Sequence, residues 1–351
     1  MPAPVRSPAC GRGKAVGTAS GQNRAVLLQV RHLHVEFDLG RETLFGPRRQ
    51  LQAVTGVDFD LSAGETLAVV GESGCGKSTL ARAVLGLMPA SGSVRLDGQE
   101  LLGLSEHDMR PHRRDLQIIF QDPLASLDPR MTVAQIVAEP LRALLPELSA
   151  AQRRSRITTV LERVGLSRGQ LNRYPHEFSG GQAQRIGIAR ALVVQPRMLV
   201  CDEPTSALDV SIKAQVINLL RELQQEMGLS LLFITHDLAT VRHLADRVLV
   251  LYLGRVMEVA DTVTLFANPR HPYTRALLAA IPRGERRNTP TPTPLAGEPP
   301  SPVDVPSGCV FRTRCPWAID RCQHEVPALR DVGRARVACH RAEESAALHR
   351  D

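Results

Sequence analysis

The chain has 351 residues, 43% of them hydrophobic, and 43 Lys and Arg against 36 Asp and Glu give it a formal net charge of +7. This length and apolar content are typical of one or two folded domains, and they exclude a wholly disordered chain and a small disulfide scaffold. No apolar run approaches the roughly 18–20 residues of a membrane-spanning helix, so we expect any membrane contact to be made through a partner.

The positive charge is almost entirely arginine, because the chain holds only three lysines. We interpret this as an arginine-rich genome and not as a nucleic-acid surface, and twelve aromatic residues are few for stacking bases. We therefore expect no nucleic-acid partner. Residues 1–25 lack the apolar stretch of an export signal, which favours a disordered tail and a cytosolic protein.

The first third of the chain is β-rich. We expect strands over residues 28–37, 54–61, 66–70 and 93–96, and hairpin-type turns at Ala63-Gly64, Ser91-Gly92 and Asp97-Gly98. A helix is expected over residues 79–87, and from about 133 to 191 the pattern is mainly helical.

The second half returns to short apolar strands, at 198–201 and 230–235, on either side of a helix over 211–227 that ends at Gly228. Such strands alternating with helices predict an α/β fold with a parallel sheet covered on both faces. A hairpin is expected at 248–259, turning at Leu253-Gly254. Seven prolines within residues 284–308 predict a semi-rigid linker.

The most specific motif is a glycine-rich loop between an expected strand and an expected helix, Gly71-Glu72-Ser73-Gly74-Cys75-Gly76-Lys77-Ser78-Thr79. It fits the GxxxxGK[ST] phosphate loop, whose backbone N–H groups converge on phosphates. Lys77 is expected to reach the β- and γ-phosphates, and Ser78 to supply a hydroxyl to Mg²⁺. The sequence therefore predicts a site for a nucleoside triphosphate.

An acidic pair follows the apolar strand 198–201. Asp202 is expected to hold Mg²⁺, and Glu203 is placed to polarise an attacking water. This pair is the second half of the predicted hydrolytic site.

Further motifs narrow the class. Phe178-Ser179-Gly180-Gly181-Gln182 lies 20 residues before Asp202, Gln121 follows an expected strand, Ser206-Ala207-Leu208-Asp209 follows the acidic pair, and His236 follows another strand. Together with the phosphate loop, these residues resemble ATP-binding-cassette (ABC) ATPases. Longer stretches, among them 118–132, 174–192, 202–218 and 268–282, resemble the ATPase subunits of oligopeptide/dipeptide importers over about residues 26–340.

The resemblance implies an α/β phosphate-loop ATPase with a RecA-like core, an antiparallel β subdomain and a helical subdomain. It places the ABC ATPase domain at 26–265, with the helical subdomain at about 124–190. A peptide-importer-type extension follows at 266–351, with the proline-rich linker at 284–308 and a cysteine-rich segment at 309–339. The implied function is ATP binding and hydrolysis that energises peptide import.

The resemblance also implies the role of each motif. Two subunits sandwich two ATP molecules, so the signature residues act in trans on the partner's ATP: Ser179, Gly180, Gly181 and Gln182. His236 is expected to hold the γ-phosphate and the water, Gln121 to contact Mg²⁺ and transmit closure, and Asp209 to couple the two sites. Phe37 is the candidate for stacking on adenine, with Phe45 competing.

The implied partners are a second, non-identical ATPase subunit, two transmembrane permease subunits and an extracellular solute-binding protein, at the cytoplasmic face of the membrane. Nickel or another small solute is an alternative cargo within this subgroup. A soluble ABC ATPase of DNA repair, chromosome structure or translation is the rival class, but it usually carries long coiled coils or two cassettes, whereas this chain has one cassette and a proline-rich linker. Glu203 opposes a module that only binds ATP.

Four cysteines, Cys309, Cys315, Cys322 and Cys339, fall within 31 residues, with gaps of five, six and sixteen. Zinc prefers CxxC pairs, which are absent here, whereas a four-cysteine iron–sulfur cluster accepts wider spacings. Similar segments in peptide-importer ATPases include some that hold a [4Fe–4S] cluster, so we expect this cluster, with zinc as the second choice of metal and unpaired structural thiols as the alternative. With few apolar residues, the segment is expected to hang from the linker and to need the metal to fold.

Overall fold

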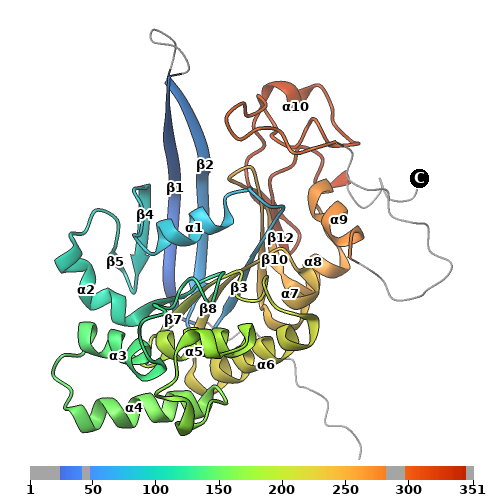
Figure 1. The fold of residues 1–351 in the computed structure, drawn as a ribbon. Coiled ribbons are helices and arrows are strands. Elements are labelled where there is room, and N and C mark those ends of the chain that lie inside the picture. The colour runs from blue at the N-terminus through green and yellow to red at the C-terminus, as the bar shows by residue number, and fades with distance from the viewer. Residues whose placement is uncertain (1–23, 42–47, 282–296, 345–351) are drawn as a thin grey trace, which may run out of the picture.

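The computed structural model describes residues 24–41, 48–281 and 297–344, which form two β-sheets and the helices around them (Figure 1). The first sheet is antiparallel, in the order β2-β1-β4-β5. Its strands are β1 (Val26–Arg41), β2 (Arg48–Ser62), β4 (Ser91–Leu96) and β5 (Gln99–Glu100). Figure 1 shows β1 and β2 as the long blue pair that rises from the body of the molecule.

Two of the predicted turns in this region have different outcomes. Asp97 and Gly98 both have positive φ, 52° and 79°, and join β4 to β5 as the expected hairpin. The turn predicted at Ser91-Gly92 is wrong, because these residues begin β4. Glycine is required there for a close approach: at φ 111°, a Cβ on Gly92 would lie 2.3 Å from the carbonyl oxygen of His32 in β1.

The second sheet has eight strands, in the order β11-β12-β10-β9-β3-β8-β7-β6. Its parallel part is β3 (Thr66–Val70), β6 (Leu116–Ile119), β7 (Met198–Asp202), β8 (Ser230–Thr235) and β9 (Arg247–Tyr252). Every residue of β3, β7 and β8 is buried, as expected for central parallel strands. The hairpin predicted at 248–259 is confirmed, because β10 (Arg255–Asp261) pairs antiparallel with β9. The sheet continues beyond it with β12 (Ala335–Val337) and β11 (Arg330–Val332), which were not predicted.

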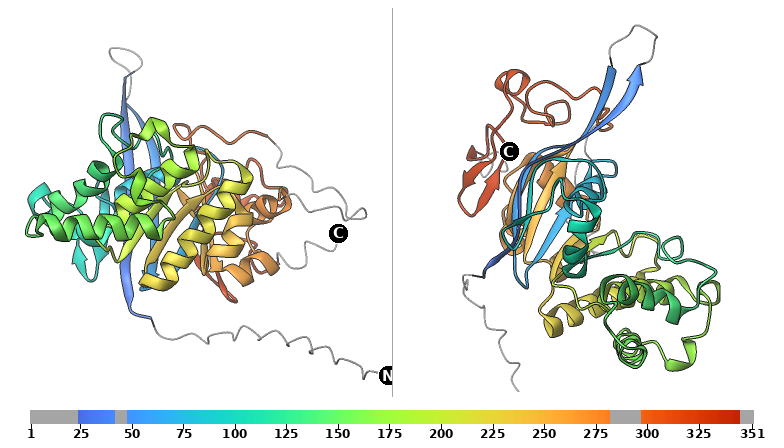
Figure 2. Two further views of the ribbon diagram at one scale, coloured as in Figure 1. Left: turned by 60° about the horizontal axis from the view of Figure 1, so that its bottom comes forward. Right: turned by 90° about the vertical axis from the view of Figure 1, so that its left-hand side faces the viewer.

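The helices lie around these sheets. They are α1 (Lys77–Val84), α2 (Glu106–Asp115), α3 (Val133–Leu144), α4 (Ala150–Arg163), α5 (Gly180–Leu192), α6 (Val210–Met227), α7 (Leu238–Leu244), α8 (Thr262–Ala267), α9 (Pro272–Ala279) and α10 (Arg321–His324). Figure 2 shows α3, α4 and α5, in green, gathered on the side of the molecule opposite the red C-terminal segment. Among the described residues, no helix is long and apolar enough to cross a membrane.

The C-terminal segment packs against the body of the molecule, and the expectation that it hangs from its linker is wrong. Strand β12 pairs with β10, so the segment extends the main sheet. Phe311 is 1% exposed, and its ring centroid lies 5.4 Å from those of both Tyr252 and Tyr273. The few apolar residues of the C-terminal segment therefore belong to a core that they share with β9, β10 and α9. Residues 1–23, and residues 282–296 of the predicted linker, lie outside the described part, and residues 297–308 contain neither helix nor strand.

Candidate functional site

The phosphate loop joins β3 to α1, as predicted, and α1 begins at Lys77, two residues earlier than expected. Gly76 caps this helix at φ 101°, and a Cβ there would lie 2.1 Å from the carbonyl oxygen of Ala53. Only glycine fits this turn. The loop therefore aims its N–H groups and the positive end of the α1 dipole at one point, which is the arrangement that binds phosphate.

Hydrogen bonds hold the side chains of Lys77 and Ser78 at the start of α1. The Lys77 side chain is 4% exposed, and its Nζ donates to the carbonyl oxygens of Gly71 and Glu72 at 3.0 and 2.8 Å. The Ser78 hydroxyl donates to Asp202 Oδ1 at 2.7 Å. Burial raises the pKa of Asp202, and the Ser78 hydrogen bond opposes that rise. A hydroxyl and a carboxylate oxygen side by side are hard oxygen ligands, so this pair fits Mg²⁺.

Glu203 lies at the centre of the predicted catalytic residues. Its Oε2 accepts from Gln121 Nε2 at 3.3 Å and lies 3.3 Å from His236 Nδ1, while its Oε1 lies 3.9 Å from Lys77 Nζ. Gln121, Glu203 and His236 come just after β6, β7 and β8, which are neighbours in the sheet. Because parallel strands end at one edge, residues that are far apart in sequence meet there, at the edge where α/β sheets bind ligands.

A pocket of about 790 Å³, including space open to solvent, lies over the phosphate loop. Phe37 of β1 lines the pocket and is 38% exposed, so its ring is accessible to a base as predicted. Phe45, the competing aromatic, lies outside the described residues. Pro302, which was not predicted, also lines the pocket.

The signature residues do not join this pocket: among the described residues that line it, none belongs to Ser179–Gln182. Ser179 is the N-cap of α5, where its hydroxyl accepts from Gln182 N–H at 3.4 Å and the Gln182 side chain accepts from Ser179 N–H at 3.1 Å. Gly180 and Gly181 form the first turn. The predicted signature residues therefore form the capped N-terminus of a helix outside this pocket.

Asp209 lies beside the signature sequence. It is exposed at the N-terminal end of α6, and a Cβ on Gly181 would lie 2.4 Å from Ile212 Cγ2 of that helix. The starts of α5 and α6 are therefore in close contact.

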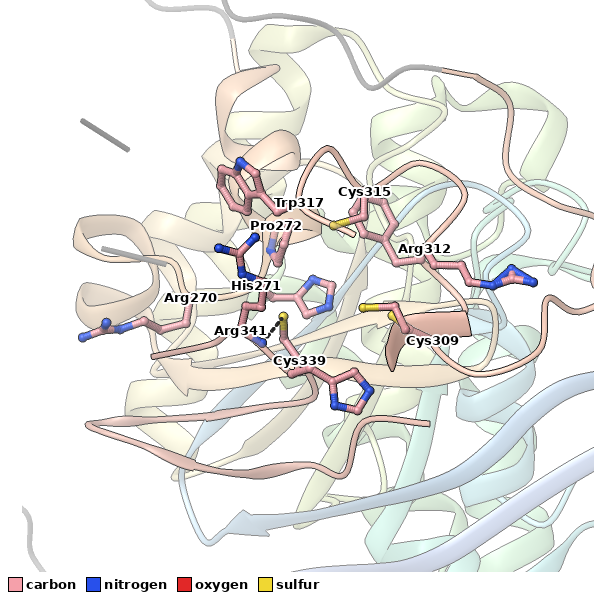
Figure 3. A pocket seen from close by; sticks show the side chains of 12 residues that line it. Arg270, His271, Pro272, Cys309, Arg312, Cys315, Trp317, Cys339 and Arg341 are labelled. Atoms are coloured by element: carbon pink, nitrogen blue, oxygen red, sulfur yellow. Dashed lines mark hydrogen bonds between the residues drawn. The ribbon is translucent and has the colours of Figure 1, made fainter. Parts of the chain in front are cut away.

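The four cysteines line one small cavity, with the sulfurs of the three labelled ones turned toward it in Figure 3. Cys309 and Cys322 are buried, whereas Cys315 and Cys339 are partly exposed, and all four are free thiols. Cys339 Sγ accepts a hydrogen bond from Arg341 N–H at 3.4 Å. Burial raises the pKa of Cys309 to about 11 and that of Cys315 to about 12. Within the described ranges, no group of three or more His, Cys, Asp or Glu residues is arranged to hold a metal ion.

The sequence analysis missed a set of residues from the C-terminal third that contact the phosphate loop. Arg314 forms a two-pronged ion pair with Glu72, at 2.6 and 3.0 Å, and Tyr273 accepts a hydrogen bond from Glu72 N–H at 2.9 Å. No motif marks these residues. Their only signal in the sequence is that the loop carries a carboxylate, which is an unusual charge beside bound phosphates.

Comparisons with known proteins agree with this geometry. One family model, described as ABC transporter, matches residues 54–206, and another, described as the C-terminal region of oligopeptide/dipeptide transporters, matches residues 257–322. The chain is 54% identical over 323 residues to the oligopeptide transport ATP-binding protein OppF of Escherichia coli, covering 91% of this chain and 97% of that protein. It is 50% identical over 319 residues to the di/tripeptide transport ATP-binding protein DppF of Pseudomonas aeruginosa, covering 91% and 98%.

Two solved structures show the same fold. One is cbiO1 of Clostridium perfringens, part of an ABC transporter complex, with 29% identity, a TM-score of 0.59 and coverage of 70% of this chain and 92% of that one. The other is a dimeric ATP-binding cassette in a post-hydrolysis state bound to ADP and Pi, with 28% identity, a TM-score of 0.60 and coverage of 67% and 99%.

Proposed function

The chain belongs to the ATP-binding subunits of oligopeptide/dipeptide ABC importers and hydrolyses ATP for peptide transport, and we propose that it does so at the loop Gly71–Thr79 with Glu203 as the catalytic carboxylate. The observation that carries this assignment is the position of Glu203, within 3.3 Å of both Gln121 and His236 and 3.9 Å from Lys77. The neighbouring carboxylate, that of Asp202, accepts a hydrogen bond from the Ser78 hydroxyl. The two adjacent acids are therefore assigned different tasks.

Each residue has a separate role in the proposed mechanism. Lys77 turns from its carbonyl partners to the β- and γ-phosphates. Ser78 and Asp202, with Gln121, would hold Mg²⁺, which would offset the phosphate charge. Glu203 accepts a proton from the attacking water, and His236 orients that water against the γ-phosphate. Gln121 donates to Glu203, so its position senses whether the site is closed.

Magnesium dependence tests the proposed metal site. Ser78→Ala is expected to raise the Mg²⁺ concentration needed for half-maximal ATPase activity, because the metal loses a hydroxyl ligand. Ser73→Ala is the matched control, since Ser73 lies in the same loop but is exposed. An unchanged Mg²⁺ requirement in Ser78→Ala would refute the assignment.

We further propose that the complete site needs a second subunit, which supplies the residues equivalent to Ser179, Gly180, Gly181 and Gln182. Two observations support this: among the described residues that line this chain's own pocket, none belongs to the signature sequence, and a related cassette is dimeric. In this proposal the partner is a non-identical ATPase subunit. The pair binds two permease subunits at the cytoplasmic face of the membrane, and an extracellular binding protein delivers the peptide.

Protein concentration tests this composite site. For the isolated chain, ATPase activity per subunit is expected to rise with concentration and to rise further when the paralogous subunit is added. Full activity from a strictly monomeric preparation would contradict it.

The domain division expected above also stands as a proposal. It comprises an ATPase domain at 26–265, with a helical subdomain at about 124–190 that contains α3, α4 and α5, and an extension at 266–351. Packing of α3, α4 and α5 against one another supports the helical subdomain, and their core continues into α6, β7 and β8. Limited proteolysis tests the division, since cuts are expected within 284–308 before any cut within 124–190.

For the cysteine-rich segment we propose a [4Fe–4S] cluster held by Cys309, Cys315, Cys322 and Cys339. The support is that four free thiols line one cavity and that a backbone N–H already donates to Cys339 Sγ. A single zinc would need its sulfurs within about 3.8 Å of one another, as tetrahedral Zn–S bonds of about 2.3 Å require. A cluster binds each thiolate at a different iron, and the absence of the CxxC pairs that zinc prefers favours iron over zinc. The cluster would cross-link the segment and take no part in hydrolysis.

Metal analysis after anaerobic purification tests this proposal. We expect about four iron and four sulfide per chain, lost in Cys322→Ser and kept in the control Cys10→Ser. A colourless protein without iron or zinc would reduce the four residues to free thiols.

A further inference from the structure

The phosphate loop is tied to the C-terminal segment by a partly buried ion pair. Arg314 donates from Nη1 and Nη2 to the two carboxylate oxygens of Glu72, 242 residues earlier in the chain. The side chains are 5% and 26% exposed, respectively. The guanidinium also lies over the ring of Tyr252, 5.9 Å from its centroid, and within 3.5 Å of the Tyr252 hydroxyl. A planar fork held on both sides in this way fixes the direction of the carboxylate.

The backbone of the same residue is held as well. Glu72 N–H donates to Tyr273 Oη at 2.9 Å, and the ring of Tyr273 packs against that of Tyr252 with centroids 4.7 Å apart. Tyr273 is fully buried. Both the main chain and the side chain of Glu72 are therefore positioned by residues that lie far beyond the loop in sequence.

Charge explains why the loop needs this support. The carbonyl oxygen of Glu72 accepts from Lys77 Nζ at 2.8 Å, so Glu72 lies directly beside the cation that must reach the phosphates. An unpaired carboxylate at this position would repel a polyphosphate and compete for Lys77. Arg314 removes both effects because it neutralises the carboxylate and fixes its direction through two hydrogen bonds.

We propose that Arg314 is a positioning residue for nucleotide binding: it neutralises and orients Glu72, so that the charge of Glu72 does not offset that of Lys77 when ATP binds. The inference rests on the nucleotide site proposed above. It assigns the cysteine-rich segment a role in ATP binding, through a residue that directly precedes Cys315.

The experiment measures binding of a fluorescent ATP analogue, and KM and kcat for ATP, on the full-length chain with its paralogous subunit. Arg314→Met is expected to weaken nucleotide binding about tenfold, within the usual range of coupling between sites. KM should rise by a similar factor, with kcat little changed at saturating ATP. Adding Glu72→Gln to Arg314→Met should restore most of the affinity, because the repelling charge is gone. Arg321→Met is the control, as Arg321 lies in the same segment but forms only an exposed pair with Glu325.

Two results would overturn the inference: wild-type affinity in Arg314→Met, or a double variant that binds no better than Arg314→Met. A purely structural role for Arg314 gives the second result, since deleting Glu72's charge does not rebuild a lost contact. If Arg314→Met does not fold, the same comparison uses Arg314→Lys with and without Glu72→Gln, where a loss of about threefold is expected to be reversed. Lys77→Ala tests the proposed nucleotide site separately from the role of Arg314. If this variant still binds the ATP analogue, the nucleotide site itself is refuted.

Discussion

Replacing Glu203 with Gln is expected to abolish turnover while ATP binding is kept. Gln has the same shape, and its carbonyl oxygen can still accept from Gln121 Nε2 as Oε2 does. It cannot take a proton from water. Because a negative charge 3.9 Å from Lys77 Nζ is removed, the loop also becomes more positive, so affinity for ATP should be unchanged or higher.

The size of the effect follows from the role assigned to Glu203. A positioned general base contributes about 10²- to 10⁴-fold to a reaction rate. At 1.36 kcal/mol per tenfold, this is a barrier increase of about 2.7–5.5 kcal/mol. The Glu203 side chain is only 14% exposed, and among the groups in contact with its carboxylate, Gln121 and Lys77 do not act as bases at neutral pH. Within the described part of the chain, the remaining side chain in contact with this carboxylate is His236, at 3.3 Å.

Steady-state phosphate release and equilibrium binding of a fluorescent ATP analogue, measured on the same preparations, test this prediction. Glu226→Gln is the matched control, because Glu226 is an exposed residue of α6 away from the site. Turnover within about threefold of wild type in Glu203→Gln would refute the role of Glu203 as base, since the expected loss is at least about 100-fold. Loss of ATP binding would instead show that Glu203 supports the loop structurally.

Three further predictions concern the loop and the cysteines. Gly76→Ala should prevent nucleotide binding, measured by the same titration, because its Cβ would meet the Ala53 carbonyl oxygen at 2.1 Å and its φ of 101° strains any other residue. Cys75 lies within the loop and is buried, and that burial raises its pKa. Iodoacetamide should therefore modify Cys75 slowly at pH 8 and faster above pH 9, and bound Mg-ATP should slow the modification further. Fast labelling at pH 7 would contradict the burial of Cys75. Cys315→Ser should raise KM for ATP by a larger factor than it lowers kcat, because Cys315 directly follows Arg314 in the chain. An unchanged KM would show that the cysteine-rich segment does not influence the phosphate loop.

The ATP site could be predicted because its chemistry follows short motifs at the ends of buried strands. The expected ABC ATPase fold is confirmed. In it, the ends of β6 and β8 bring Gln121 and His236 to the Glu203 carboxylate at the end of β7. An apolar run that is followed by a polar residue indicates both the strand and the edge where its end lies. The local pattern therefore contained most of the catalytic geometry.

The contacts of the C-terminal segment could not be predicted in this way. Glu72 and Arg314 are ordinary charged residues, and nothing near either one in sequence marks its partner 242 positions away. The packing of Phe311 was missed for a related reason, because composition counts apolar residues but does not show that one ring can complete a core begun by Tyr252 and Tyr273. The role of Gly92 was also hidden, since a glycine for close approach resembles a glycine for a turn.

The structure connects the two surfaces that a partner subunit and an ATP molecule would contact. Asp209 and Val210, which is 86% exposed, begin α6 next to the signature turn at Gly181. One turn further along α6, Lys213 pairs with Asp237, the residue after His236, and Asp237 caps α7 by accepting from Ala239 N–H. A subunit that presses on the start of α6 therefore acts on the strand end that carries His236, 3.3 Å from Glu203. In the composite site proposed above, α6 would therefore link docking of the partner to the position of His236 beside Glu203, and hydrolysis would depend on a second subunit even when ATP is already bound.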